Sequence, residues 1–210
     1  MATEHNFFRQ VMGQFATGVT IVTTQTDDGF SGLTVNSFTS VSLDPALVLI
    51  CIDLKSHTLP YLRSSGSFAV NILTKDQEEL SRCFAIASSE RNEYFCNAPY
   101  HVAATGSPVL DGILAFVDAR IVAEYPGGDH AIFLGKVEAM GTDGKVLFLN
   151  EEGKARSTLT EWQDSSLNNT YAPLPAEGNA PLAYYRGKYR HLASDYVTPS
   201  LATSYEKEYR

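Results

Sequence analysis

Three segments of β-type sequence follow one another near the start of the chain, with only turns between them. Residues 19–24 are β-branched throughout, and Asp27, Asp28 and Gly29 form a typical hairpin turn before a second run at residues 30–37. The third run, residues 46–53, is apolar on both faces, which is typical of a central strand. The sequence therefore predicts a sheet built from neighbouring antiparallel strands.

Further strands are expected along the chain. Residues 68–73 alternate as a strand does, and residues 112–125 and 129–140 flank a tight Pro-Gly-Gly-Asp turn. An aromatic strand is expected at residues 181–189. The total of six or seven strands indicates a mainly β fold with helical excursions, most simply an antiparallel barrel.

Two main helices are expected among these strands. An amphipathic helix opens the chain after Thr3, a possible N-cap, and a second helix begins near Thr74, where Gln77 stands in capping-box position. A short helical connection at residues 54–66 is expected to be interrupted by Pro60. The apolar side chains that recur at helical spacing in the first helix are Phe8, Val11, Met12 and Phe15.

The length of 210 residues suits one domain, and we expect residues 1–210 to form it. A polar insertion at about residues 150–180 precedes the last strand and holds Trp162, the only tryptophan, together with Tyr171. A loop of this length in a compact domain is usually functional or disordered. We expect it to fold as a lid over the active site or, alternatively, to extend a dimer contact.

The composition argues against several classes of protein. No apolar run approaches the ~20 residues of a membrane span and no secretory signal is visible, so a cytoplasmic protein is expected. A formal net charge of −8 without a basic run makes nucleic acid a poor partner. Neither a Rossmann dinucleotide motif nor a P-loop is present, and no metal site is expected. Cys51, Cys83 and Cys96 have no C-x-x-C spacing and are expected to be buried free thiols.

Residues 34–42 are unusual for a strand, because about half of their side chains are small and carry a hydroxyl or an amide. Short side chains let the backbone N–H groups face a ligand and add donors of their own. The alternative is a solvated strand face that leads to a turn at Asp44 and Pro45. The segment alone does not decide between these interpretations.

The chain resembles the flavin reductase-like family, the short-chain NAD(P)H:flavin oxidoreductases with an FMN-binding split barrel. Four stretches carry the resemblance, in the family's order over most of residues 8–140: FRQVMGQFATGVTIVTT, GLTVNSFTSVSLDPALVLICID, FAVNILTKDQEELSRCFA and GGDHAIFLGKVEAM. PLAYYRGKYRHL is a weaker fifth. The insertion departs from the family, which commonly has a much shorter connection there.

The resemblance implies a flavin site made by two strand ends. A run of short residues would line the isoalloxazine ring and the ribityl chain, and the loop after residue 52 would lie near the phosphate end. For Ser56 and Thr58, simple helix capping is the alternative. The implied ring residues are Thr34, Val35, Asn36 and Ser37; Ser40, Val41 and Ser42 continue around the ribityl chain, and Asp53, Ser56 and Thr58 lie at the phosphate end.

The resemblance also implies a catalytic residue, His130, beside the nicotinamide. Without the family, a lone histidine in a turn is more simply a surface residue. Arg82 and Phe84 correspond to a helix that passes the flavin, although Phe84 is alternatively a core residue. Tyr185 and Tyr189 are expected to be packing residues.

The function that the resemblance implies is transfer of a hydride from C4 of NAD(P)H to N5 of FMN or FAD. Reduced flavin would then diffuse to a separate oxygenase, as in two-component flavin monooxygenases, and the protein would be a homodimer. One alternative is a protein that holds FMN tightly under the insertion as a lid and is not a free-flavin reductase. A weaker one is a monooxygenase that acts on its own substrate.

Overall fold

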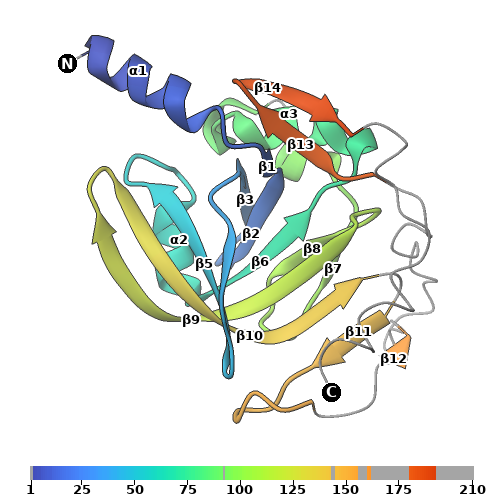
Figure 1. Cartoon of the computed structure of the whole chain (residues 1–210). Helices are drawn as coiled ribbons and strands as arrows, with labels where there is room; N and C mark the ends of the chain where they lie inside the picture. Colours follow the sequence, from blue (N-terminus) through green and yellow to red (C-terminus); the bar gives the residue numbers. More distant parts are fainter. Residues whose placement is uncertain (1, 92, 143–144, 156–159, 162–179, 193–210) are drawn as a thin grey trace, which may run out of the picture.

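The computed structural model describes residues 2–91, 93–142, 145–155, 160–161 and 180–192 of the chain. A nine-stranded sheet dominates them, in the order β12-β11-β10-β9-β6-β2-β3, with β5 paired to β10 and β4 to β5. The sheet curls into a barrel (Figure 1). Its strands are β2 Thr20–Thr26, β3 Gly29–Val35, β4 Thr39–Leu43, β5 Ala46–Asp53, β6 Ser67–Ile72, β9 Ala115–Gly127, β10 His130–Thr142, β11 Lys145–Phe148 and β12 Thr160–Glu161.

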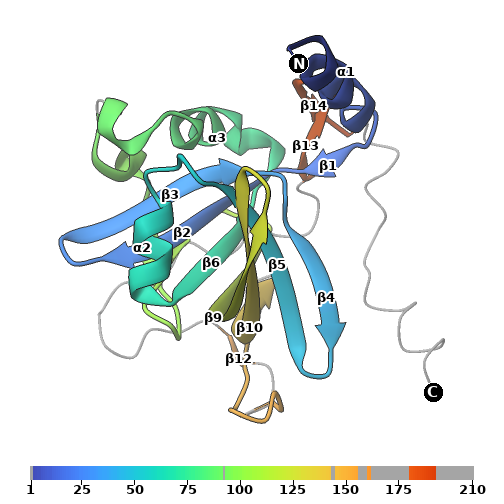
Figure 2. The ribbon, with the colours of Figure 1, turned by 90° about the vertical axis from the view of Figure 1, so that its left-hand side faces the viewer.

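The barrel is split because two different strands, β5 and β11, pair with the same edge of β10. All of β10 pairs with β9, whereas its first half pairs with β5 and its second half with β11. All of these pairs are antiparallel, as the sequence predicted. Figure 2 shows the β4–β5 hairpin diverging from the C-terminal part of β10, the part that pairs with β11.

Two-residue turns join the strands that the sequence predicted to be hairpins. Thr26 pairs with Gly29, and Gly127 pairs with His130 across the Pro-Gly-Gly-Asp turn. Gly128 in that turn has φ +74°, a conformation that glycine adopts without steric cost. A third tight turn, with a cis Asp44–Pro45 peptide bond, joins β4 to β5.

The remaining strands form two small sheets. In one of them β1, Thr17–Gly18, pairs with β13, Leu182–Tyr185, which pairs with β14, Lys188–His191. In the other, β7, Tyr100–Val102, pairs with β8, Pro108–Leu110. The described residues thus contain more than the six or seven strands expected, partly because the aromatic run near the C-terminus folds into a hairpin instead of one strand.

In the described parts of the chain the α-helices are α1 Ala2–Met12, α2 Leu59–Ser65 and α3 Glu78–Ala85. Short 3-10 turns are η1 Lys75–Gln77, η2 Ser88–Glu90 and η3 Tyr94–Asn97. The capping box is confirmed, because the Thr74 N–H donates to Gln77 Oε1 at 3.1 Å at the start of η1. None of the helices within the described ranges combines the length and the apolar character of a membrane span.

Two helix predictions were wrong. Thr3 does not cap α1, because the helix already includes Ala2. Pro60 does not interrupt a helix but lies in the first turn of α2, where a backbone N–H has no intrahelical acceptor and the fixed φ of proline suits the helix. The apolar side chains of α1 lie largely exposed, and the helix projects from one end of the barrel (Figure 1).

The prediction of three free thiols was also wrong, because Cys83 in α3 and Cys96 in η3 form a disulfide with a Cα–Cα distance of 6.1 Å. The chain turns back after α3, so two cysteines 13 residues apart meet although their spacing matches no motif. Cys51 is free and half-buried. The disulfide fixes η3 against α3, beside the core residue Phe84.

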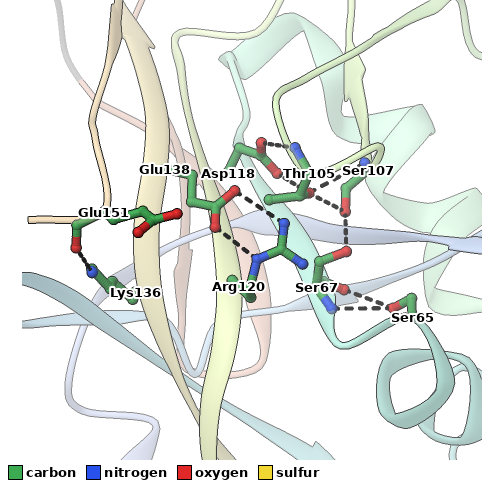
Figure 3. A network of polar contacts seen from close by, with 9 residues as sticks. All are labelled: Ser65, Ser67, Thr105, Ser107, Asp118, Arg120, Lys136, Glu138 and Glu151. Atoms are coloured by element: carbon green, nitrogen blue, oxygen red, sulfur yellow. Dashed lines mark hydrogen bonds and ion pairs between the residues drawn. The ribbon is translucent and has the colours of Figure 1, made fainter. Parts of the chain in front are cut away.

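A line of hydroxyl groups crosses the interior next to the apolar core (Figure 3). The hydroxyls of Ser67 and Ser107 are 3.3 Å apart, and Thr105 Oγ1 lies 2.9 Å from the Ser107 hydroxyl. The line ends at Asp118, which is fully buried and accepts bonds from the Thr105 N–H and hydroxyl at 2.8 and 2.5 Å. The buried polar groups therefore satisfy one another, as an interior of low polarity requires.

Burial raises the pKa of the Asp118 carboxyl to about 6, because desolvation outweighs the two bonds from Thr105, while the nearby charges of Glu138 and Arg120 oppose each other. A raised pKa in the folded state means that stability is gained at low pH and lost as the pH rises through 6. Relative to Asp118→Asn, the wild-type free energy of unfolding should fall by about 2 kcal/mol between about pH 4.5 and about pH 7.5. Urea denaturation of both proteins measures this difference, and parallel curves would contradict it.

Candidate functional site

The end of β3 and its connection to β4 form one rim of the barrel. Between the two strands, the main-chain N–H groups of Asn36, Ser37 and Phe38 donate to no other group of the described residues. Asn36 is exposed and Ser37 and Phe38 are half-buried, so these donors are open to water or to a ligand. Three consecutive free donors at this rim fit a ligand that presents hydrogen-bond acceptors along one edge.

The hydroxyls of Thr34 and Ser37 hold this rim in place. Ser37 Oγ donates to the Cys51 carbonyl at 2.8 Å and accepts from the Cys51 N–H at 3.2 Å. Thr34 Oγ1 donates to the Ser81 carbonyl of α3 at 2.6 Å. Both hydroxyls are therefore used within the protein, so a ligand at this rim would meet the main chain of these residues.

The rest of the segment is more accessible. Asn36 is exposed and its Nδ2 donates to Thr17 Oγ1 at 3.2 Å. A bulge between Ser40 and Ser42 leaves Val41 half exposed, with Ser40 exposed beside it and Ser42 half-buried. This arrangement suits a ligand-facing surface and also a solvated strand, so the assignment of these residues, and of Val35 at the end of β3, stays a prediction.

The loop after β5 continues the same rim. Asp53 pairs with His130 across β5 and β10, and its Oδ1 accepts from the Lys55 N–H at 2.8 Å. Ser56 Oγ accepts from the Thr58 N–H at 3.2 Å, and the buried Thr58 hydroxyl lies 3.0 Å from Ser31 Oγ. Thr58 thus points into the protein, and its side chain makes no capping bond although the residue stands at the N-cap of α2. The role of Ser56 and Thr58 at the phosphate end stays a prediction.

His130 begins β10 directly after the hairpin turn, and its Nδ1 lies 2.7 Å from Asp129 Oδ1. The hydrogen bond and the charge of His130, with a smaller contribution from His5, hold the pKa of the Asp129 carboxyl below its usual value. Asp129 therefore stays ionised and orients the imidazole through Nδ1. Nε2 is then the ring nitrogen left to face a ligand, on a side chain that is 41% exposed.

Arg82 and Phe84 belong to α3 and do not lie on the rim formed by residues 34–42 and the loop after β5. The exposed Arg82 guanidinium pairs with Glu78 and stacks 4.8 Å from the ring centroid of Tyr189. Phe84 is fully buried and packs edge-on against Phe95 at 5.0 Å. Phe84 is therefore a core residue, which was the alternative interpretation of the sequence. Its side chain is not exposed at the site.

A cavity of about 600 Å³ adjoins the rim and contains residues that the sequence interpretation missed. Asn36 and Ser37 line one side of it, and Arg9, Tyr184 and Arg186 line others. Arg186 stands in the β13–β14 turn with φ +51°, followed by Gly187 at +72°. In the sequence, Arg186 and Gly187 stand between two segments that contain tyrosine, and this pattern could have predicted a turn here.

The insertion lies mostly outside the described residues, including Trp162 and Tyr171. Its first residues form a turn in which the Asn150 side chain accepts from the N–H groups of Glu152 and Lys154. Lys136 of β10 donates to the Glu151 carbonyl, and Gly153 lies beside Pro45 of the β4–β5 turn. The predictions of a lid and of a dimer contact remain untested.

The rim brings most of the candidates together. Ser37 bonds to Cys51, two residues from Asp53, which in turn pairs with His130. A flavin carries acceptors and donors along its pyrimidine edge, so the free N–H groups fit such a ring, and the imidazole of His130 lies on the same end of the barrel. The residues present therefore suit a planar heterocycle with a second ligand beside it.

Comparison with known proteins identifies the family of the chain. The family model described as a flavin reductase like domain matches residues 12–193. A flavin-dependent monooxygenase reductase subunit of Mycobacterium tuberculosis is 31% identical over 92% of this chain and 85% of its own length. An NADH-dependent flavin reductase of Rhodococcus sp. is 40% identical over 64% of this chain and 76% of its own.

Solved structures agree. A nitrilotriacetate monooxygenase component B homologue from Mycobacterium thermoresistibile has a TM-score of 0.72 at 31% identity, covering 95% of this chain and 92% of its own. An NADH:FAD oxidoreductase of Streptomyces globisporus, solved with NAD and FAD fragments, has a TM-score of 0.68 at 30% identity, covering 93% and 97%. The fold, the rim and these likenesses together show that the chain belongs to the flavin reductase like domain family.

Proposed function

We propose that this flavin reductase takes its hydride from NAD(P)H and passes it to FMN or FAD bound at the rim formed by residues 34–42. The reduced flavin then leaves by diffusion for a separate oxygenase. The observation that carries the proposal is the set of free main-chain donors at residues 36–38, on the same end of the barrel as His130. The names of the relatives support the same reaction and the oxygenase partner.

Each part of the site has a distinct task in this proposal. When bound, the flavin supplies the two-electron acceptor for a hydride from C4 of NAD(P)H. The N–H groups of residues 36–38 pair with the ring edge, and the side chains of Asn36 and Ser40 add short donors. His130, whose Nδ1 lies against Asp129, would contact the nicotinamide through Nε2. No side chain acts as a nucleophile.

A protein that holds FMN tightly without reducing free flavin is the rival function. The visible spectrum of the purified protein, followed by an NADH oxidation assay with added FMN or FAD, separates the two. The reductase should consume NADH in proportion to many equivalents of added flavin. Stoichiometric bound FMN with no turnover of added flavin would favour the rival. Comparison of NADH with NADPH in the same assay identifies the donor.

We further propose a homodimer in the cytoplasm, and the exposed apolar side chains support the dimer. Leu43 at the β4–β5 turn is 95% exposed, and Val41, Phe7 and Val11 are at least half exposed. Phe7 and Val11 are four residues apart on one face of α1, and neighbouring apolar side chains mark interaction sites more often than isolated ones do. Light scattering should give twice the mass of one chain, and a monomeric mass at micromolar concentration would contradict this prediction. The single-domain organisation and the cytoplasmic location stay predictions.

A further inference from the structure

The disulfide between Cys83 and Cys96 closes a loop that lies along β3. β3 is the last strand in the order of the large sheet, and no other described strand pairs with its outer edge. Such an edge has free backbone groups, which proteins often cover with a helix or a loop. Residues 81–91 and 93–97 do this here, and we call them the covering segment. Figure 2 shows α3, which contributes its first residues, lying over β3.

The covering segment bonds to every second residue of β3. The bonds are three: the Phe30 N–H donates to Tyr94 Oη at 2.7 Å, Arg91 Nη2 donates to the Gly32 carbonyl at 2.7 Å, and Thr34 Oγ1 donates to the Ser81 carbonyl at 2.6 Å. Thr34 is also the first residue of the rim. Because β3 runs directly into the rim, a displacement of the covering segment would move the proposed flavin site.

The η3 part of the covering segment has a backbone conformation that needs a restraint. Phe95, Cys96 and Asn97 are three successive residues with φ of +48°, +55° and +49°. This left-handed region is unfavourable for residues other than glycine, with asparagine the more tolerant. Packing of Phe95 against Phe84, at 5.0 Å between ring centroids, is one restraint, and the disulfide of Cys96 is another. Opening of the disulfide should therefore make local opening of η3 more frequent.

The disulfide lies where redox reagents can reach it. Cys83 and Cys96 are both half-buried, so part of each side chain is open to solvent. Disulfides of cytoplasmic proteins, the location that we propose for this chain, are usually transient or redox-sensing. The proposed reaction also generates an oxidant. Reduced flavin that meets O2 before it meets the oxygenase passes two electrons and two protons to O2, which gives oxidised flavin and hydrogen peroxide.

We propose that Cys83 and Cys96 form a reversible oxidation site that controls flavin binding at the rim. In the disulfide form the covering segment holds β3 and the rim in the geometry that binds flavin. In the dithiol form the segment loosens and flavin binds more weakly. Tighter retention of flavin after oxidation limits the release of reduced flavin when peroxide accumulates. The proposal rests on the flavin reductase function, which supplies the peroxide.

Both directions of the reaction balance. For oxidation, one cysteine thiolate attacks a peroxide oxygen and breaks the O–O bond, which gives a sulfenic acid and hydroxide. The second thiolate attacks that sulfur and displaces a second hydroxide, and the two thiol protons convert the hydroxides to water. For reduction, a thiolate of an external dithiol attacks the disulfide, and its second thiol resolves the mixed disulfide. The external dithiol is oxidised and both cysteines become thiols.

The test compares two redox states of the wild-type protein. One sample is reduced with dithiothreitol and desalted under nitrogen, and half of it is then oxidised with hydrogen peroxide. Alkylation followed by mass spectrometry should count three thiols in the reduced sample and one, Cys51, in the oxidised sample. The matched control is the double variant Cys83→Ser, Cys96→Ser, which retains Cys51 and so reveals any effect of oxidising that thiol. The comparison of wild-type states stands even if the variant fails to fold.

The reduced wild type should bind oxidised flavin about 10-fold more weakly than the disulfide form, which corresponds to one hydrogen bond lost at the rim. Peroxide should restore the affinity of the wild type, whereas the double variant should stay weak after either treatment. In steady-state assays the KM for flavin should rise about 10-fold on reduction while kcat stays near that of the disulfide form. Hydrogen exchange at the Phe30 N–H, which Tyr94 holds, should be faster in the reduced protein.

The source of the oxidant is tested during turnover. Reduced wild type that oxidises NADH with added flavin in air, without an oxygenase, should regain its disulfide, and catalase should prevent this. Re-formation of the disulfide at the same rate with catalase would overturn the role of peroxide.

Three results would overturn the oxidation site itself. The first is equal flavin affinity and equal hydrogen exchange in the two redox states. The second is a disulfide that dithiothreitol does not reduce in the folded protein, and the third is a dithiol form that peroxide does not close. Failure of the proposed function looks different. A wild-type protein that reduces no flavin contradicts the reductase assignment, yet the thiol counts and the hydrogen exchange still test the oxidation site.

Discussion

Replacing His130 with alanine is expected to slow the reduction of flavin by NAD(P)H by roughly 10- to 100-fold, or about 1.4–2.7 kcal/mol of transition-state stabilisation. The physical reason is positional. Asp129 engages Nδ1 of the imidazole at 2.7 Å, and in the proposed function Nε2 contacts the nicotinamide and helps to position it for hydride transfer. Anaerobic stopped-flow absorbance at increasing NADH concentration measures the rate constant of reduction.

Two controls separate this role from a structural one. The affinity for oxidised flavin and the stability in urea should remain those of the wild type, because the side chain of His130 is 41% exposed. His191→Ala, which removes an exposed imidazole near Glu78, should leave the rate unchanged. If His130→Ala is reduced as fast as the wild type from about pH 6 to about pH 8, the histidine has only a surface role.

Replacing Phe84 with alanine is expected to lower the free energy of unfolding by about 3–5 kcal/mol, because it leaves a cavity in the core. Phe84 is fully buried, packs edge-on against Phe95 and lies beneath the guanidinium of Arg91, 4.7 Å from its ring centroid. Urea denaturation measures the change. A loss of this size is a large part of the stability of an ordinary domain.

The same variant separates the two interpretations of Phe84. If it is a core residue, the protein that remains folded at low temperature should bind flavin with wild-type affinity. Phe15→Ala, which removes an exposed ring, should change stability by no more than about 0.5 kcal/mol. A Phe84→Ala protein with near-normal stability and weakened flavin binding would instead place the ring in the cofactor site.

The β architecture was predictable because its signals are local. The β-branched run before Asp27 and the glycine pair at residues 127–128 specify hairpins through backbone preferences that neighbouring residues alone determine. The capping box at Thr74 and Gln77 is likewise a contact over three residues. These features do not depend on the rest of the fold, so the sequence pattern was sufficient.

What the sequence missed depends on contacts between distant segments. The disulfide of Cys83 and Cys96 needs the turn after α3, and the pairing of Ser37 with Cys51 joins strand ends that only the barrel brings together. Arg186 gains its position from Gly13 and Gln14, more than 170 residues earlier in the chain. The sequence also did not predict the direction of side chains, because the Thr58 hydroxyl points into the protein towards Ser31.

The central claim, that the rim of residues 34–42 binds flavin, is tested most directly by flavin titration of the double variant Asn36→Leu, Ser40→Val. Both side chains are exposed at the rim, so the variant should fold normally. Binding should weaken by about 1–3 kcal/mol for each hydrogen bond that is lost, measured by the quenching of flavin fluorescence. Unchanged flavin affinity in the folded double variant would contradict the account and favour the solvated strand face.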